Sequence, residues 1–296
     1  MDKQNFYGIS GFSNEEARKY ISLLFDGYEM RKKEKRLYVH DGVPEIIIKT
    51  YYSFVEKQCF DQIVYNFKRR YIYNESKLEQ VHSKEEKDGL ACVYNYIQTK
   101  KDLENINIYD LSYIHEALYS KTPFPEFGGK YRQREIYLLG NSQNGLNTGS
   151  VELCPYWDIT HEMNALKPVV DELVKRGIKL GENIDVNNLI DYINDCVKLK
   201  CKIIKIHPFE DGNGRATRAF INLLFRLANI PPIYVENKEK EKYQKAMNNA
   251  LVKDDFSDII NFYYFKICDS IMALDISIKK DLSYEDADLN AQKKEK

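Results

Sequence analysis

Apolar residues recur along most of this chain at the three- and four-residue spacing of amphipathic helices. The repeat is clear in residues 14–33, 46–73, 83–98 and 109–119. Ser83 is followed three positions later by Glu86, which is the sequence signature of a helix N-terminus. The first part of the chain is therefore predicted to be helical.

The helical pattern returns towards the C-terminus. Residues 186–206 place an apolar set on one face, namely Leu189, Ile193, Cys196, Val197 and Ile204. Residues 219–230 are apolar nearly all round, which is typical of a helix that is buried on every side. Pro231 and Pro232 should end that helix. The whole pattern predicts an all-α fold built around one buried helix.

One stretch interrupts this pattern. Residues 121–155 are rich in proline, glycine and asparagine, and they contain two short runs with β propensity, Glu135–Leu139 and Ser150–Leu153. We predict a loop and a small β-hairpin here, on the surface of the helical body. The charged residues 276–296 at the C-terminus are expected to fray.

Composition narrows the classes of function. The 296 residues are 43% hydrophobic, which is enough for a substantial core, and 44 basic residues balance 45 acidic ones. This balance argues against a protein that binds nucleic acid mainly through bulk charge. The sequence has no apolar run long enough to cross a bilayer, and its start lacks the layout of a signal peptide. We expect a cytoplasmic protein with no membrane partner.

Polar chemistry is concentrated in one segment, HPFEDGNGRATR, at residues 207–218. Pro208 disfavours helical geometry at His207, so a preceding helix should end there. A glycine-rich turn at residues 212–214 then leads straight into the apolar helix. Such a turn presents free N–H groups and the positive end of the helix dipole, which together make an anion site.

Charged side chains accompany the predicted anion site. Arg215 and Arg218 are three residues apart on one side of the helix, and each can form forked hydrogen bonds to phosphate. Asp211 offers the oxygen ligand that Mg²⁺ prefers, and His207 can accept a proton near neutral pH. Each feature alone has an ordinary structural explanation. Their fixed order before an apolar helix indicates transfer of a phosphate-containing group from a nucleotide.

The segment HPFEDGNGRATR resembles the signature of the Fic family (filamentation induced by cAMP) at every defining position. The run GGKYRQREIYLLG is similar to the segment that precedes the active-site flap in that family. The resemblance covers roughly residues 100–275 and implies a Fic-type helical bundle with a small β-hairpin flap. It divides the chain into an N-terminal helical region at 1–98, a catalytic core at 99–275 and a tail at 276–296.

The activity that the resemblance implies is protein adenylylation. AMP would pass from ATP to a Tyr, Ser or Thr hydroxyl of a target protein or of the chain itself, with release of pyrophosphate. His207 would be the catalytic base, and Asp211 would hold Mg²⁺. The nucleotide would be bound by Asp211, Gly212, Asn213, Gly214, Arg215, Ala216, Thr217 and Arg218.

Two further elements follow from the resemblance alone. Tyr243 matches an aromatic position near the adenosine. The flap would align the target segment by strand addition. Its residues would be Thr148, Gly149, Ser150, Val151 and Glu152.

Many Fic proteins also carry an inhibitory helix whose glutamate pairs with the second arginine of the motif. Its pattern is Ser or Thr, three residues, Glu, and then Gly or Asn. The candidate in this chain lies near residues 70–82, with Glu79 as the glutamate. Glu75 stands where Ser or Thr is expected, and Gln80 stands where Gly or Asn is expected. A Glu79–Arg218 pair would occupy the γ-phosphate site.

Several alternatives stay open. The same fold could transfer UMP, phosphocholine or phosphate, or it could remove AMP from a target. A nucleotide-binding regulatory module without turnover is the non-enzymatic reading. Intact Gly214 favours AMP over phosphate, and intact His207 and Asp211 favour an enzyme. The identity of the target and the formation of a homo-oligomer are not fixed by the sequence.

Overall fold

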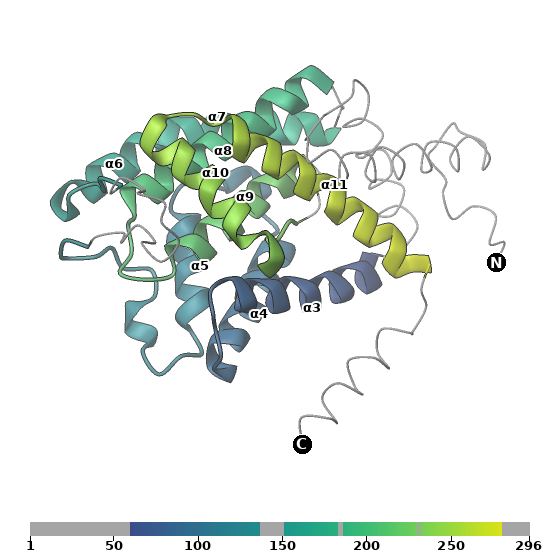
Figure 1. The fold of residues 1–296 in the computed structure, drawn as a ribbon, viewed down its shortest axis with the longest axis horizontal. Helices are drawn as coiled ribbons and strands as arrows, with labels where there is room; N and C mark the ends of the chain where they lie inside the picture. The colour runs from purple at the N-terminus through teal and green to yellow at the C-terminus, as the bar shows by residue number, and fades with distance from the viewer. Residues whose placement is uncertain (1–59, 137–150, 183–185, 229, 231, 280–296) are drawn as a thin grey trace.

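The structure is a computed structural model, and it describes residues 60–136, 151–182, 186–228, 230 and 232–279. The described residues form a bundle of helices, and no β-strand occurs among them (Figure 1). The all-α prediction is confirmed for this part of the chain. The β-hairpin flap is not shown. Thr148, Gly149 and Ser150 lie outside the described residues, and Val151 and Glu152 are described without forming a strand.

Most helices follow one another with short connections, but residues 120–158 separate α5 from α6. They are α3 (Phe60–Leu78), α4 (Lys84–Thr99), α5 (Asp110–Tyr119), α6 (Ile159–Ala165), α7 (Lys167–Glu182), α8 (Val186–Ile206), α9 (Asn213–Leu227), α10 (Lys240–Lys253) and α11 (Ser257–Lys279). Single 3₁₀ turns lie between some of them, namely η2 (Leu103–Asn105), η3 (Pro125–Phe127), η5 (Tyr156–Asp158) and η6 (Asn237–Glu239).

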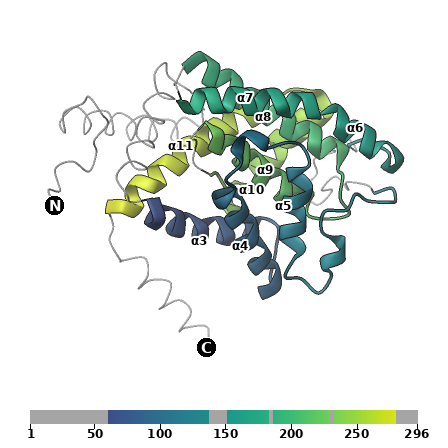
Figure 2. The ribbon, with the colours of Figure 1, turned by 180° about the vertical axis from the view of Figure 1, so that it is seen from behind.

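Helix α9 lies at the centre of the bundle. It runs between α7 and α8 on one side and α4 and α5 on the other, and it contacts all four (Figures 1 and 2). Every residue from Arg215 to Phe225 is buried. An all-round apolar surface can be removed from water only in such a position, so the prediction of a central buried helix is confirmed.

Helix α8 packs beside α9 and ends next to its start. Four of the five residues predicted on its inward face are buried, as Leu189 and Val197 illustrate. Ile204 is only half-buried, because Ile203 and Ile206 take the inward positions of the last turn. Helix α8 stops at Ile206, where the following Pro208 predicts its end.

The N-terminal part of the described chain covers one edge of the bundle. Helix α3 contacts α4 and also lies beside α11, although the two are far apart in sequence (Figure 1). The predicted helix at 46–73 corresponds in part to α3, since residues 46–59 lie outside the described ones. Within the described residues, no helix has the combined length and apolar character that spanning a membrane requires.

Helices α4 and α5 approach closely at Gly89. A Cβ at this position would lie far inside contact distance of the backbone carbonyl of Leu118 on α5. Backbone atoms cannot move aside as a flexible side chain can. Glycine therefore allows the two helices to reach the spacing that places both beside α9.

We expect Gly89→Ala to destabilise the protein by about 1–3 kcal/mol, because the clash exceeds the gain in helix propensity. The measurement is the free energy of unfolding in urea, with Lys87→Ala as the control on the exposed face of the same helix. Equal stability of Gly89→Ala and the wild type would contradict the close approach of α4 and α5.

Candidate active site

His207 begins the connection between α8 and α9. Its φ of +53° lies in the left-handed region, which costs a residue with a side chain about 1–2 kcal/mol. Its backbone N–H donates to the carbonyl of Ile203 at 2.9 Å, and its Nδ1 lies 3.2 Å from the carbonyl of Ile204. A carbonyl only accepts hydrogen bonds, so Nδ1 carries the hydrogen. In the neutral ring, Nε2 then keeps its lone pair.

The surroundings of His207 favour that neutral ring. Burial lowers the pKa of the imidazole below its ordinary value of 6.5, and the positive charge of Arg132 acts in the same direction. The hydrogen bond to Ile204 and the negative charge of Asp211 oppose the shift without reversing it. At pH 7 the ring is therefore neutral, the state in which Nε2 can accept a proton.

The motif then turns into α9 through Gly212. Its φ of +76° is a conformation that glycine adopts without strain. A Cβ here would lie 3.2 Å from Nε2 of His115, so the turn also has little room for a side chain. Helix α9 begins at Asn213, and the N–H groups of its first residues have no partner within the helix. This end of α9 has the features of an anion site.

Asn213 closes the same turn from within. Its Nδ2 donates to the carbonyl of Phe209 at 2.7 Å, and its Oδ1 accepts from the N–H of Phe209 at 2.9 Å. The side chain is buried and holds the loop in shape. Of Asn213, only the backbone N–H therefore remains for an anion.

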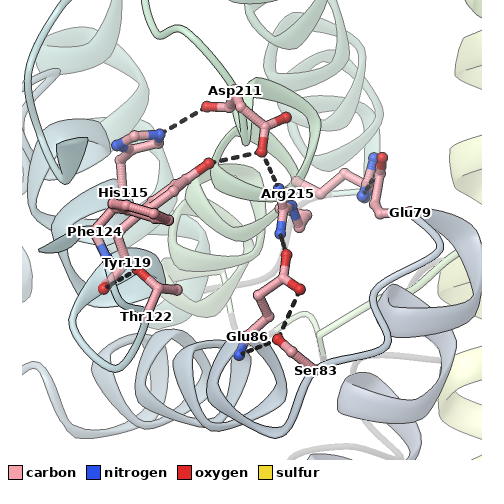
Figure 3. Close-up of polar contacts among 10 residues, drawn as sticks. Glu79, Ser83, Glu86, His115, Tyr119, Thr122, Phe124, Asp211 and Arg215 are labelled. Atoms are coloured by element: carbon pink, nitrogen blue, oxygen red, sulfur yellow. Dashed lines mark hydrogen bonds and ion pairs between the residues drawn. The ribbon is translucent and has the colours of Figure 1, made fainter.

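Helix α5 holds Asp211 from the other side (Figure 3). Tyr119 donates its hydroxyl hydrogen to Oδ2 of Asp211 at 2.7 Å, and Nε2 of His115 lies 2.8 Å from the Asp211 carbonyl. The N–H of Gly129 donates to Nδ1 of His115 at 2.9 Å, so the hydrogen of a neutral His115 must be on Nε2. Burial lowers the pKa of His115 to about 4, which keeps the ring neutral.

Asp211 presents an ionised carboxylate at the surface of the site. Its side chain is 73% exposed. Partial burial acts to raise its pKa, but the charge of Arg215 and the hydrogen bond from Tyr119 together lower it. Arg215 donates from Nη2 to Oδ2 of Asp211 at 2.7 Å. One oxygen of Asp211 thus accepts from both neighbours.

Arg215 also faces a carboxylate from α4. Its Nη1 lies 3.6 Å from Oε1 of Glu86. Ser83 donates its hydroxyl hydrogen to Oε2 of Glu86 at 2.8 Å and accepts from the Glu86 N–H at 3.2 Å, which caps α4 (Figure 3). The start of α4 is therefore fixed against the start of α9.

Arg218 is bound by two glutamates from the N-terminal region. Glu75 on α3 is fully buried and accepts from Nε of Arg218 at 3.0 Å with each of its oxygens, and from Nη2 at 2.6 Å. Glu79, just past the end of α3, accepts from the same Nη2 at 2.5 Å. The structure therefore brings the predicted partners Glu79 and Arg218 together, and it adds Glu75.

The two glutamates differ in their electrostatics. Burial raises the pKa of Glu75, although the charge of Arg218 acts against it. Burial acts in the same direction on Glu79, but there the charge and hydrogen bond of Arg218 prevail and the pKa is lowered. Glu79 is the more exposed, with a third of its side chain accessible. It is the outer of two carboxylates on one guanidinium.

The backbone after Glu79 has the conformation that the Gly or Asn of the inhibitory pattern would adopt. Gln80 has a φ of +57°, in the left-handed region that glycine and asparagine tolerate best. The position thus has the backbone conformation that suits Gly or Asn, and this chain adopts it with glutamine. The other departure, Glu75 in place of Ser or Thr, supplies the second carboxylate.

The remaining predicted residues lie in different surroundings. Ala216 and Thr217 are buried inside α9. Tyr243, on α10, is also buried, with its ring 5.4 Å from that of Phe262 and 4.9 Å from Nζ of Lys200. Val151 is half-buried and Glu152 is exposed. Roles for these residues in nucleotide or target binding stay predictions.

Sequence reasoning missed four residues that build the site. In the sequence, Glu75 is only a mismatch to the inhibitory pattern, and Arg132 is only part of the segment before the flap. His115 and Tyr119 carried one signal, their i,i+4 spacing, which puts both on the same face of α5. What that face touches depends on how α5 packs against the motif loop, and spacing does not show this.

Comparisons with known proteins show which family part of the chain resembles. Residues 105–225 match the model of the Fic/DOC family. The chain is 26% identical over 164 residues to a protein adenylyltransferase Fic of Nematostella vectensis, covering 55% of this chain and 33% of the relative. A protein of the same name from Culex quinquefasciatus is 25% identical over 164 residues, covering 55% of this chain and 28% of the relative. The chain thus spans about a third of these relatives.

Solved structures share the fold. A Fic domain-containing signaling protein of Bacteroides thetaiotaomicron superposes with a TM-score of 0.59 at 16% identity, covering 79% of this chain and 97% of the other. A Fic family protein of Desulfovibrio desulfuricans gives 0.57 at 15% identity, covering 83% and 78%. The motif, the family model and the shared fold agree: residues 105–225 of this chain are similar to the Fic/DOC family, and the described helices share the fold of Fic structures.

Proposed function

We propose that this protein is an adenylyltransferase that moves AMP from ATP to a hydroxyl side chain of a protein. The observation that carries the proposal is the continuous connection from α8 to α9. It holds a neutral His207, an ionised and exposed Asp211, and the start of a helix that bears Arg215 and Arg218. The adenylyltransferase names of the Nematostella vectensis and Culex quinquefasciatus relatives support the choice of AMP.

The chemistry assigns a step to each group. Nε2 of His207 accepts the proton of the target hydroxyl while the hydroxyl oxygen bonds to the α-phosphorus of ATP. The bond from that phosphorus to the bridging oxygen breaks, and pyrophosphate leaves. The N–H groups at the start of α9, with Arg215 and Arg218, bind the oxygens of the departing phosphates. The products are the AMP-modified hydroxyl and pyrophosphate.

The residues present also fit a Mg²⁺ ion shared with the nucleotide. Asp211 is the residue that would hold it, because its carboxylate is exposed and ionised. Mg²⁺ needs only one or two carboxylates when phosphate oxygens and water complete its shell. Bound there, Mg²⁺ would neutralise phosphate charge during transfer. Tyr119 and Arg215 orient the carboxylate through Oδ2.

In this proposal the C-terminal end of α3 and the residue that follows it inhibit the transfer reaction, as an internal brake. Glu75 and Glu79 occupy Nε and Nη2 of Arg218, so these N–H groups are not available to a phosphate. Two carboxylates on one guanidinium also leave an excess of negative charge where the phosphates would lie. Arg215 is likewise engaged by Asp211 and Glu86. Productive binding of ATP therefore requires at least one of these carboxylates to withdraw.

Labelled ATP identifies the transferred group. With ATP and Mg²⁺, label on the α-phosphate should appear on protein, and label on the γ-phosphate should not. His207→Ala should reduce the labelling by about 100-fold or more, since general-base catalysis contributes factors of this size. Gel autoradiography and intact-protein mass spectrometry measure both effects. Transfer of γ-label would mean kinase chemistry and would exclude adenylylation.

The pH dependence of the reaction follows from the state of His207. Protonation of Nε2 removes the base, so the rate should fall as the pH decreases through the pKa of the ring. Since that pKa is lowered, the fall should lie below pH 6.5. The measurement is the initial rate of α-label transfer between pH 5 and 8 at limiting ATP with Mg²⁺, because kcat/KM reports the pKa of the free enzyme. A half-maximal point above 6.5 would contradict a buried neutral base.

The brake predicts a graded response to mutation. Glu79→Gly should raise labelling by about 10-fold, and adding Glu75→Gln should raise it further, because Glu75 alone still holds Nε and Nη2 of Arg218. Glutamine keeps the buried volume of the glutamate, and Glu85→Gln on the exposed start of α4 is the control. The readout is α-label incorporated per minute. A double variant no more active than the wild type would rule out the brake.

A further inference from the structure

Arg132 is a buried cation close to the active site. It lies in the loop after η3, and its side chain has no exposed surface. A guanidinium is costly to bury unless its N–H groups are paired. Its ion pair with Glu135 is long, at 3.6 Å, and the carboxylate of Glu135 is itself 38% exposed. Its other partners are backbone carbonyls.

Those carbonyls belong to three separate points of the chain. Nε of Arg132 donates to the carbonyl of His207 at 2.8 Å, and Nη1 donates to the carbonyl of Arg134 at 2.8 Å. Nη2 donates to the carbonyl of Cys154. The backbone N–H of Arg132 donates to the carbonyl of Pro208 at 2.8 Å. The residue thus binds the two successive carbonyls at the start of the motif.

The contact with the His207 carbonyl involves the one residue of the motif, apart from glycine, that has a left-handed backbone. His207 needs its neighbours to hold a left-handed backbone that an isolated chain would leave. The carbonyl that Arg132 binds is that of His207 itself, so the contact fixes the plane of the peptide that follows. Fixing this plane fixes the direction in which the imidazole leaves the backbone.

The same side chain also reaches both ends of the segment predicted to form the flap. Arg134 precedes that segment and Cys154 follows it, while residues 137–150 between them lie outside the described ones. The N–H of Cys154 also donates to the carbonyl of Lys205 at 3.1 Å. The chain that leaves the flap segment is therefore fixed against the end of α8, next to His207.

We propose that Arg132 is a positioning residue for the catalytic base. It holds the backbone of His207 in its left-handed conformation and fixes that backbone to both ends of the flap segment. The base and the two described ends of the flap segment are thereby held by one side chain. This inference rests on the proposed adenylyl transfer and adds to it the residue that aligns the base. The hydrogen bonds of the Arg132 side chain do not involve Arg215, Arg218 or the start of α9, which would bind ATP.

The kinetic test separates turnover from nucleotide binding. Arg132→Gln should lower the turnover of α-label transfer by about 100-fold, because small misplacements of a reacting group cost factors of this size. The affinity for a non-hydrolysable ATP analogue should change by less than about 2-fold, as expected when no binding residue is touched. Lys130→Gln, which removes an exposed positive charge two residues away, is the matched control.

A second measurement does not depend on activity. Nitrogen chemical shifts of the imidazole report which ring nitrogen carries the hydrogen, and His207→Ala identifies its signals among those of the five histidines. The wild type should show hydrogen on Nδ1 of His207. Arg132→Gln should lose this fixed form and give a mixture of both tautomers. This readout stays valid even if the wild type transfers no AMP.

Each outcome either supports or contradicts a positioning role for Arg132. Lower turnover with intact nucleotide affinity and altered tautomers in Arg132→Gln supports the proposal. A smaller loss of turnover, about 10-fold, in Arg132→Lys also supports it, because lysine keeps the charge but makes fewer contacts. Unchanged turnover and tautomers in Arg132→Gln would overturn it. So would a joint loss of turnover, nucleotide affinity and cooperative unfolding in both variants, because that pattern marks a role in folding alone.

Discussion

The site depends on the joint between α8 and α9, where the chain leaves one buried helix and enters another within residues 207–212. Two left-handed residues, His207 and Gly212, bound this joint. Glycine adopts that conformation freely, whereas His207 is held by contacts from Arg132 and from the end of α8. The joint places a neutral imidazole at one end and the free N–H groups of a helix start at the other. The residues that connect the two helices are therefore also those proposed to take part in the reaction.

Around this joint, the N-terminal region supplies negative charge. Glu75 and Glu79 engage Arg218, and Glu86 lies beside Arg215. Two like charges on one guanidinium, one buried and one partly exposed, oppose each other. Each carboxylate is attracted by the arginine and repelled by the other, and the inner one also loses its hydration. An arrangement of this kind can hold a site closed while leaving the outer glutamate able to give way to phosphate.

Much of the fold could be predicted from the sequence, because the signals are local. The helical period, the apolar run of α9 and the effect of Pro208 on α8 each depend on neighbouring residues. Ile204 shows the limit of that approach. Its period places it inward, but Ile203 and Ile206 take the inward positions where α8 ends beside the motif.

The residues of the candidate site are likewise only partly predictable from the sequence. The motif residues from His207 to Arg218 could be recognised because they are contiguous. Glu75 and Arg132 act over 143 and 75 positions in sequence, respectively, and only the packing of α3 and of the loop after η3 shows their partners. In the sequence, Glu75 is a departure from the inhibitory pattern, and only its contact with Arg218 gives its carboxylate a role.

The most direct test is a crystal structure of the Glu75→Gln, Glu79→Gly variant with Mg²⁺ and a non-hydrolysable ATP analogue. We expect the terminal phosphates to lie within hydrogen-bonding distance of Arg215 and Arg218 at the start of α9. The α-phosphorus should face Nε2 of His207. A nucleotide bound elsewhere, or one whose α-phosphorus is turned away from His207, would contradict it.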